Sequence, residues 1–431
     1  MYYKMDKRYI KNFDELATTE NRKFALEIAE AGLDAINTEK VISDSVKLEN
    51  NILLIKGELF DLSKFKRIKV VGFGKASCGA AIALEKILGD KIKEGAVIGL
   101  QKVTCDYIET FIGSHPRPSS ANINAGKKIY EIANKSNEDD LIILIASGGG
   151  SALLCYSESE CTQGIKLYDV FLKYGQTITE INTIRKHLSF LKGGGLAKVA
   201  YPATIIGLIF SDVPGDRFQD VASGPTYKDN TTAHDAEMII RKYNLGKFDL
   251  FETPKNDKYF EKVHNFILVS NKTAVKAMEK RAQELDFETN IVSTELYEEV
   301  AEALKEIFSV QKNNSASCVV LAAGEPKLEV TKKGGKGGRN LFMGLRALKM
   351  KIVDENSVFI PLASDGMDNS DSAGVVIDKN TLEKVEKLGI DLDDFLDRFD
   401  AYSAFEKSGD MIMTGPTGAN VSDLMILLTK K

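Results

Sequence analysis

The segment Val70-Val-Gly-Phe-Gly-Lys-Ala-Ser77 places a Gly-x-Gly turn and a lysine directly after a short apolar run that begins at Ile68. An apolar run, such a turn and then a helical pattern over 78–88 are typical of a strand that feeds a helix in an α/β sheet. The turn directs backbone N–H groups and the Lys75 ammonium toward an anion. The segment therefore predicts a phosphate-binding loop at the end of a buried strand.

The turn matches neither of the two familiar nucleotide fingerprints. The Gly-x-x-x-x-Gly-Lys spacing of a Walker A loop is missing, and Ser77 stands where a dinucleotide fingerprint has its third glycine. The next predicted strand continues as Gly99-Leu-Gln-Lys102, without the acidic residue that holds the ribose in NAD enzymes. A nicotinamide cofactor is therefore disfavoured. The alternative for the turn itself is a tight glycine turn with a solvated lysine.

Short runs rich in Val and Ile alternate with helical patterns throughout the chain. In the first half, strands are predicted near 68–71, 96–100, 141–145 and 203–210, with helical sequence over 78–88, 122–133 and 165–191. After a polar stretch at 228–262, strands are predicted near 266–269, 290–292, 318–322, 358–362, 374–377 and 424–428. This βαβ alternation is typical of a parallel sheet with both faces covered. We expect an α/β protein with a Rossmann-like, doubly wound domain at 1–245 and a smaller C-terminal α/β domain at 246–431.

Length and composition support this organisation and exclude several classes of protein. A chain of 431 residues exceeds the usual size of a single core. A net charge of −5 offers no broad cationic field for nucleic acid or anionic lipid. The five cysteines are scattered without a Cys-x-x-Cys pair, so neither a disulfide framework nor a zinc site is indicated. The polar N-terminus and the short apolar runs predict neither a signal peptide nor a membrane span, and we expect a soluble cytoplasmic protein.

Two further strand ends in the first half carry polar groups. Ser147-Gly-Gly-Gly-Ser151 follows the strand at 141–145, and three consecutive glycines favour an anion-binding nest over a plain loop. Asp212 follows the strand at 203–210, and Asp216 lies beyond a Pro-Gly turn. Carboxylates in such positions are typical of a general base or a metal ligand, and the alternative is an Asx turn.

Acidic residues also follow two strands of the second half. Glu325 comes after the strand at 318–322, and Asp365 and Asp368 come after the strand at 358–362. Acidic residues at several strand ends indicate Mg²⁺, and the spacing does not fit an EF-hand calcium loop.

A glycine-rich basic loop at 331–340 carries Lys333, Lys336 and Arg339 and leads into a helical pattern. Such a loop is expected to fold over phosphates, and the alternative is a flexible surface loop. Asn420 adds a polar group before the last strand.

Two sites in the first half are candidate substrate ligands. His115 lies in a loop flanked by prolines, where the alternative is a structural histidine. Asn182 and Arg185 stand at i and i+3 on a predicted helix, from which they can reach a carboxylate. The alternative for this basic helix is a solvated face.

Together these segments resemble the glycerate 2-kinase family, whose C-terminal half is called the MOFRL domain. The resemblance rests on motifs that occur in family order, at 71–77, 114–116, 147–152, 191–195, 211–216 with 222–225, 324–326, 337–340, 363–368 and 414–420. Each motif alone is weak, but the ordered set is specific.

The resemblance implies phosphorylation of D-glycerate at its 2-hydroxyl, with ATP as co-substrate and Mg²⁺ or Mn²⁺ as cofactor, giving 2-phosphoglycerate and ADP. It further implies a role in central carbon metabolism, through the non-phosphorylative Entner-Doudoroff route or the degradation of glycerate and hydroxypyruvate. By motif position it places five residues in the cleft between the domains, namely Lys75, Asp212, Glu325, Arg339 and Asp365.

With the resemblance in place, each candidate residue receives an expected role. Lys75, Asp212 and Arg339 are expected to be catalytic, and Glu325 and Asp365 to hold the metal. The residues expected to bind the nucleotide are Ser147, Gly148, Gly149, Gly150, Ser151, Lys336 and Asn420, and those expected to bind glycerate are Lys75, Arg339, His115 and Arg185. We expect a monomer or homodimer that binds small molecules, without nucleic acid or membrane as partner. The alternatives are a hydroxypyruvate reductase and a non-catalytic sensor of sugar phosphates or nucleotides.

Overall fold

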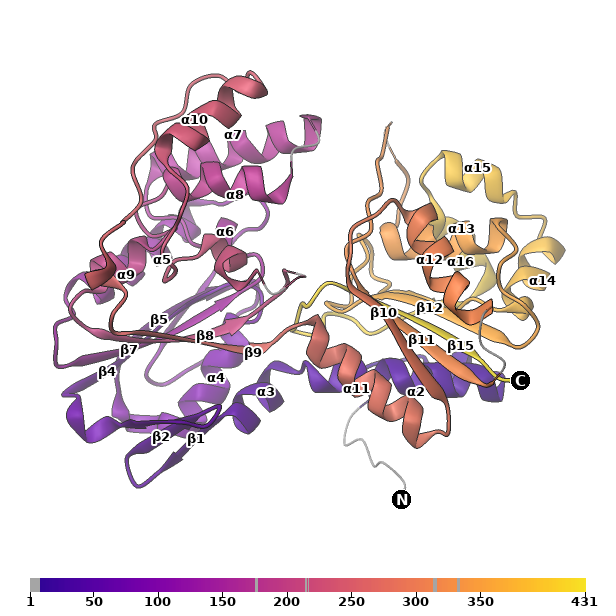
Figure 1. Cartoon of the computed structure of the whole chain (residues 1–431), viewed down its shortest axis with the longest axis horizontal. Helices are drawn as coiled ribbons and strands as arrows, with labels where there is room; N and C mark the ends of the chain where they lie inside the picture. Colours follow the sequence, from indigo (N-terminus) through magenta and orange to yellow (C-terminus); the bar gives the residue numbers. More distant parts are fainter. Residues whose placement is uncertain (1–7, 175–176, 214, 216, 313–315, 332–333) are drawn as a thin grey trace. The chain divides into compact units, whose positions relative to one another are not determined.

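The protein is described from a computed structural model, which covers residues 8–174, 177–213, 215, 217–312, 316–331 and 334–431 (Figure 1). The chain forms two compact units. The central unit comprises Thr38–Leu268, and the terminal unit comprises Met1–Asn37 together with Val269–Lys431. The chain therefore passes from one unit to the other twice, and the described residues 8–37 belong to the same unit as residues 269–431.

The division falls elsewhere than at the expected boundary between 245 and 246. Strand β9 (Val263–Val269) lies beside β8 (Thr204–Phe210) in the first sheet, so it closes that sheet rather than opening the second. At the other end, helix α2 (Glu20–Ala35) packs against α11 (Asn271–Glu284), β12 (Ser357–Ala363) and β15 (Asp423–Thr429). A polar stretch in a sequence marks a surface segment, but it does not reveal which sheet the next strand joins.

The central unit contains the expected doubly wound parallel sheet. Its strand order is β6-β5-β4-β7-β8-β9, and each neighbouring pair from β6 to β8 is parallel. The remaining strands are β4 (Arg67–Phe73), β5 (Ile92–Gly99), β6 (Glu109–Ile112) and β7 (Asp140–Ser147). Because the chain winds outward from β4 in one direction and from β7 in the other, the strand order reverses between these two strands.

Helices cover both faces of this sheet (Figure 1). Helix α4 (Ser77–Leu88) packs on β4, β5 and β7 together with α3 (Thr38–Ser45), while α5 (Ser120–Asn134) and α9 (Gly195–Ala200) cover the other face. A small antiparallel sheet of β1 (Val46–Glu49), β2 (Ile52–Ile55) and β3 (Glu58–Asp61) lies beside α4.

A further group of helices in the central unit is α6 (Gly150–Leu153), α7 (Glu158–Tyr174), α8 (Ile178–His187) and α10 (Ala233–Lys242). Short 3-10 turns complete the unit at η1 (Leu62–Lys64), η2 (Gly89–Lys91), η3 (Phe218–Ser223) and η4 (Asp257–Tyr259).

The terminal unit is a second α/β layer structure with the strand order β10-β11-β15-β12-β13-β14. Strand β10 (Glu288–Leu296) is parallel to β11 (Cys318–Gly324), whereas β15 runs antiparallel between β11 and β12. The remaining strands are β13 (Gly374–Val375) and β14 (Met411–Ile412). The carboxyl ends of β10, β11 and β12 therefore meet the amino end of β15 at one edge of the sheet.

Helices α2 and α11 cover one face of this sheet, and α12 (Val300–Lys312) and α13 (Arg339–Lys349) cover the other (Figure 1). Outside these layers lie α1 (Phe13–Leu16), α14 (Lys379–Lys387), α15 (Leu392–Asp397) and α16 (Ala401–Ser408).

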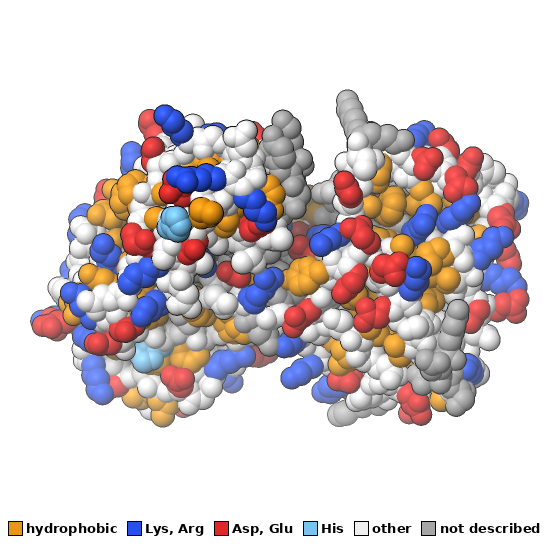
Figure 2. Space-filling view, turned by 45° about the horizontal axis from the view of Figure 1, so that its top comes forward, with side chains coloured by type: hydrophobic (Ala, Val, Ile, Leu, Met, Phe, Trp, Pro, Cys, Tyr) orange, Lys and Arg blue, Asp and Glu red, His pale blue; other side chains and the backbone are white. Residues whose placement is uncertain are grey.

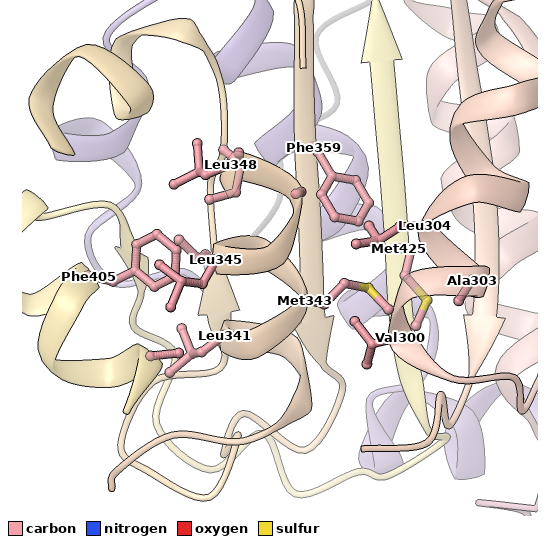
Figure 3. Close-up of a cluster of buried hydrophobic side chains, with 14 of the residues drawn as sticks. Val300, Ala303, Leu304, Leu341, Met343, Leu345, Leu348, Phe359, Phe405 and Met425 are labelled. Carbon is pink, nitrogen blue, oxygen red and sulfur yellow. The ribbon is translucent and has the colours of Figure 1, made fainter. Parts of the chain in front are cut away.

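Helix α13 is embedded in the core of the terminal unit. Figure 3 shows Leu341 and Leu345 turned toward Phe405 of α16, and Met343 turned toward Met425 of β15. All of these side chains are buried. Apolar contacts on two sides hold the helix in place, and they thereby fix the position of Arg339 in its first turn.

The surface is chemically mixed. In the view of Figure 2, acidic and basic side chains alternate over both units, without a large region of one sign. Among the described residues, no helix combines the length and apolar character needed to cross a membrane.

A buried ion-pair network joins the N-terminal helix to the rest of the terminal unit. Arg22 of α2 is 1% exposed, and its Nε lies 2.6 Å from Oδ2 of Asp378. Its Nη1 lies 2.8 Å from Oδ1 of Asp410, and its Nη2 donates to Oγ1 of Thr381. Asp378 is also the N-cap of α14. One guanidinium thus connects two carboxylates that are distant from it in the sequence.

We expect Arg22→Leu to lower the free energy of unfolding by about 3–5 kcal/mol, because it leaves Asp378 without a cation in a buried environment. Urea unfolding followed by circular dichroism measures the change. Lys305→Leu is the matched control, because Lys305 lies in the same unit and forms an exposed pair with Glu302. The control should lose less than about 1 kcal/mol. Equal losses in both variants would contradict a structural role for the network.

The difference in the free energy of unfolding between wild type and Arg22→Leu should depend on pH. Burial acts to raise the pKa of Asp378, but hydrogen bonding and charge from Arg22 outweigh burial and hold this pKa below its usual value. An acid with a depressed folded-state pKa stabilises the fold above its unfolded-state pKa, and this stabilisation is lost as the pH falls through the folded-state pKa. The difference between wild type and Arg22→Leu should therefore be constant above about pH 5 and shrink toward about pH 3.

Candidate functional site

Two loops of the central unit meet where the strand order reverses. The backbone N–H of Lys75, after β4, donates to the carbonyl of Gly148, after β7, over 2.8 Å. The backbone N–H of Ala76 donates to Oγ of Ser147 over 3.0 Å. In open parallel sheets, ligands bind beyond the carboxyl ends of the strands at such a reversal point. The predicted phosphate loop and the predicted glycine nest are therefore direct neighbours.

Glycine is required for this contact. Gly74 has φ +126°, and a Cβ placed on it would lie 2.1 Å from Oγ of Ser147. Any side chain at position 74 would therefore push the two loops apart.

Three predicted site residues surround the glycines of the second loop. A Cβ on Gly149 would lie 3.2 Å from Cγ of Lys75 and 3.2 Å from Cδ2 of His115. A Cβ on Gly148 would lie 2.0 Å from Oδ2 of Asp212. The structure thus brings Lys75, His115 and Asp212 together around two adjacent glycines, although they come from three separate parts of the sequence.

The backbone of the same loop supplies hydrogen-bond donors. Within the described part of the chain, no acceptor takes a hydrogen bond from the backbone N–H groups of residues 148–151. Gly149 has the left-handed conformation, with φ +76°. Successive N–H groups around a left-handed residue form a concave anion site. Neutral donors, a lysine and a carboxylate therefore face one small region.

Arg185 reaches this region through a short polar chain. Oγ of Ser151 lies 2.8 Å from Oγ of Ser223, which donates to Oδ1 of Asn182 over 3.3 Å. Nη1 of Arg185 lies 3.5 Å from the same Asn182 oxygen. Burial lowers the pKa of Arg185 to about 10. Arg185 and the glycine loop are thus linked within the central unit.

The terminal unit holds a second group of predicted site residues at one sheet edge. Asp423, the first residue of β15, pairs in register with Gly324 of β11 and with Ala363 of β12. Glu325 directly follows Gly324, and Asp365 comes two residues after Ala363. The antiparallel insertion of β15 therefore places three acidic residues at this edge.

Arg339 lies among these acids. Its Nε is 2.5 Å from Oδ2 of Asp423, and its Nη2 is 3.5 Å from Oε2 of Glu325. Asp368 accepts hydrogen bonds from the backbone N–H groups of Gly338, Asn340 and Leu341 over 2.8–3.1 Å. Asp368 thus caps the start of α13, and its carboxylate is used to hold the turn that carries Arg339.

Sequence analysis missed Asp423. Burial raises the pKa of Asp423 to about 7. The negative charges of Glu325 and Asp368 also raise this pKa, whereas the positive charge of Arg339 lowers it. The available signal was an aspartate directly before the apolar run at 424–428. Its significance depends on β15 lying between β11 and β12, and that pairing is not encoded in a local pattern.

The remaining candidates have their own contacts. Nζ of Lys336 lies 2.7 Å from Oδ1 of Asp371 and 3.5 Å from the ring centre of Tyr402. Asn420 accepts a hydrogen bond from Oγ of Ser364, next to Asp365. Asp216 and Lys333 lie outside the described residues.

The sheet edge that carries Glu325, Asp365 and Asp423 is here called the acidic edge. Its residue types suit a metal ion that also binds oxygen atoms of a bound substrate. Among the described residues, no three His, Cys, Asp or Glu side chains are close enough to form a metal site by themselves. Mg²⁺ commonly binds one or two carboxylates and takes its other oxygens from water and substrate phosphates. Glu325 and Asp365 fit this kind of site.

Comparisons with known proteins cover nearly the whole chain. Residues 24–250 match a family model described as a domain of unknown function, DUF4147, and residues 318–423 match the MOFRL family. A glycerate 2-kinase of Pyrococcus horikoshii is 33% identical, with 94% of this chain and 97% of the relative aligned. A putative hydroxypyruvate reductase of Agrobacterium vitis is also 33% identical, over 84% of this chain and 87% of the relative.

A solved structure agrees with these matches. The crystal structure of a glycerate kinase from Thermotoga maritima aligns with a TM-score of 0.81 and 30% identity, over 94% of this chain and 99% of that one. Two matching domains, identity along most of the sequence and a shared fold show that the chain belongs to the glycerate 2-kinase family.

Proposed function

We propose that this protein transfers the γ-phosphoryl group of ATP to the 2-hydroxyl of D-glycerate, giving 2-phosphoglycerate and ADP, with Mg²⁺ or Mn²⁺ as cofactor. Family membership supports the reaction class. The observation that carries the proposal is the convergence of Lys75, His115 and Asp212 on a glycine loop with available N–H groups. That arrangement suits a phosphorylated ligand beside a reactive hydroxyl.

Phosphoryl transfer depends mainly on alignment and on neutralising the charge of the moving group. In this proposal the Lys75 ammonium and the loop from Ser147 to Ser151 bind phosphate oxygens. The N–H groups are fixed by the backbone, so they need little rearrangement during the reaction. Lys336 and Asn420 contact the nucleotide in the same proposal, and Lys336 exchanges Asp371 for phosphate.

Asp212 is proposed to orient the glycerate hydroxyl and to accept its proton. Its carboxylate packs against Gly148, beside the proposed phosphate site. A base must lie within hydrogen-bonding reach of the proton it takes, and a residue at a strand end is held rigidly enough to do so. His115 and Arg185 are proposed to bind glycerate.

Arg339 is proposed to stabilise the transferring phosphoryl group or to bind the glycerate carboxylate. Its planar guanidinium can form two parallel hydrogen bonds, which a lysine cannot. Asp423 and Glu325 hold its orientation. Glu325 and Asp365 would hold the metal, which neutralises phosphate charge when it is bound. Residues of both units therefore contribute to one reaction in this proposal.

The wider setting belongs to the same proposal. We propose a cytoplasmic monomer or homodimer that supplies 2-phosphoglycerate to central carbon metabolism, through the non-phosphorylative Entner-Doudoroff route or the degradation of glycerate and hydroxypyruvate.

Lys75→Ala and Arg339→Ala should each lower kcat by at least about 100-fold. Each substitution removes a protein cation that is proposed to neutralise the negative charge of the transferring phosphoryl group. If both act in the same step, the double variant should be clearly less impaired than the product of the two single effects. ADP release coupled to NADH oxidation measures the rates. Lys86→Ala, an exposed lysine of α4 paired with Glu39, is the control and should retain wild-type turnover. Near-normal turnover of folded Lys75→Ala would refute the central assignment.

Metal dependence tests the acidic edge separately. Chelation with EDTA should abolish turnover, and added Mg²⁺ should restore it. Glu325→Gln and Asp365→Asn should raise the Mg²⁺ concentration needed for half-maximal rate, because each removes one proposed oxygen ligand. Glu329→Gln, an exposed acid in the following loop, serves as the control. Unchanged Mg²⁺ dependence in both test variants would place the metal elsewhere.

The identity of the product tests the reaction itself. Enolase added alone should convert the product to phosphoenolpyruvate, since enolase acts on 2-phosphoglycerate. A requirement for a mutase as well would assign the phosphate to the 3-hydroxyl. Reduction of hydroxypyruvate with NADH, followed at the nicotinamide absorbance band, should not occur. If it did, the reductase name of the Agrobacterium vitis relative would describe this protein better.

A further inference from the structure

Three consecutive residues at the end of η3 have the left-handed backbone conformation. The φ angles are +50° for Ala222, +60° for Ser223 and +61° for Gly224. Glycine adopts this conformation readily, but a residue with a Cβ is strained in it. Such strain persists only where the surrounding structure enforces it, and it concentrates at functional sites. We call residues 222–224 the strained turn and ask what it supports.

A pair of glycines, Gly193 and Gly194, enforces the strained turn. The backbone N–H of Gly193 donates to the carbonyl of Ser223 over 2.9 Å, and that of Gly194 donates to the carbonyl of Gly224 over 2.8 Å. A Cβ on Gly194 would lie 2.9 Å from the carbonyl oxygen of Tyr227, so a side chain there would separate the two segments. The glycines therefore let one backbone lie directly against the other, and two hydrogen bonds hold the turn in its strained form.

The strained turn packs on the glycine loop at 147–151. A Cβ on Gly150 would lie 2.6 Å from Cβ of Ala222, so the two backbones are in close contact. Ser223 is 0% exposed, and its Oγ lies 2.8 Å from Oγ of Ser151. The turn thus supports the end of the loop that leads into α6.

The hydrogen bonds of this region commit the hydroxyl proton of Ser151 to the protein. Ser223 donates its single hydroxyl proton to Oδ1 of Asn182 over 3.3 Å. Ser223 is therefore the acceptor in its contact with Ser151, and Ser151 is the donor. At the other end of the loop, Oγ of Ser147 accepts from the backbone N–H of Ala76. Both serine hydroxyls hold the loop in place, which leaves the backbone N–H groups between them as donors for an anion.

We propose that Ser223 is a positioning residue for phosphate binding. The strained turn holds its hydroxyl against Ser151, and this contact keeps the backbone N–H groups of the glycine loop aligned on a phosphate. Ser223 acts through Ser151 and does not touch the ligand. Naming ATP as the source of the phosphate rests on the proposed function. A rigid support of this kind keeps the donors fixed, so they need no rearrangement when the anion binds.

Binding of inorganic tripolyphosphate, measured by calorimetry, tests the positioning role. Ser223→Ala should weaken this binding about 10-fold, the loss expected from one hydrogen bond, and should raise the KM for ATP by a similar factor. A residue that only supports the fold would lower the midpoint of thermal unfolding and leave the affinity for tripolyphosphate unchanged. That result would overturn the proposal.

A double-mutant cycle tests whether Ser223 acts through Ser151. Ser151→Ala should weaken tripolyphosphate binding by about the same factor as Ser223→Ala, because each substitution removes the same contact. The double variant should then bind no more weakly than either single variant. Independent effects that multiply to about 100-fold would contradict this route of action.

Ser136→Ala is the matched control. Ser136 is a buried serine of the same unit whose Oγ accepts from Nζ of Lys69 and donates to the carbonyl of Ile132. It precedes β7, whereas the glycine loop follows this strand. Ser136→Ala should lower the thermal midpoint and leave tripolyphosphate binding at the wild-type level. If Ser223→Ala does not fold, Ser223→Gly removes the same hydroxyl, accommodates the left-handed backbone without strain and should show the same weakened binding.

The two ligands separate this proposal from the proposed function. Tripolyphosphate binding that weakens in Ser223→Ala supports the positioning role, even if no phosphoryl transfer to glycerate is detected and the proposed function fails. An active kinase whose Ser223→Ala variant keeps the wild-type affinity for tripolyphosphate and the wild-type KM for ATP would overturn the positioning role and leave the proposed function intact. Failure of the wild-type protein to bind tripolyphosphate would overturn the positioning role as well, because the loop would then hold no phosphate to be positioned.

Discussion

The close approach of Gly74 to Ser147 is the constraint on which the candidate site of the central unit depends. Strands β4 and β7 are neighbours, so the loops that leave them must either touch or diverge. They touch because position 74 has no side chain. This contact places Lys75 against Gly149, where His115 also packs, and Asp212 lies against the neighbouring Gly148. The absence of a side chain at position 74 thus allows segments that are distant in the sequence to form a common surface.

Two arginines in this protein illustrate opposite uses of the same side chain. Arg339 is bordered by Asp423 and Glu325, so its orientation is fixed while much of its charge is compensated. Among the residues that the structure describes, Arg185 lies 3.5 Å from the amide oxygen of Asn182 and forms no ion pair with a carboxylate. A compensated guanidinium is suited to accurate placement, and an uncompensated one is suited to attracting an anion. The acidic neighbours, more than the arginines themselves, determine this difference.

Local sequence patterns predicted those parts of the fold that are local in origin. The buried strands β4, β7 and β8 are continuous apolar runs, and the loops after them contain the glycines and acids that were identified. Pairing between distant segments was not predictable in this way. Strand β9 joined the first sheet rather than the second, and β15 inserted between β11 and β12, which gave Asp423 its position. The ion pair of Lys336 with Asp371 likewise depends on a fold that brings separate loops together.

The order in which the chain is synthesised conflicts with the order in which its units can be completed. Helix α2 is synthesised well before β12 and β15, on which it packs. The central unit is continuous in sequence and lies wholly between these segments, so it can fold while the ribosome is still working. Until β12 and β15 have been synthesised, the face of α2 that packs on them is not covered by these strands. The apolar face of α2 is therefore covered only after the strands at the other end of the terminal unit have been synthesised.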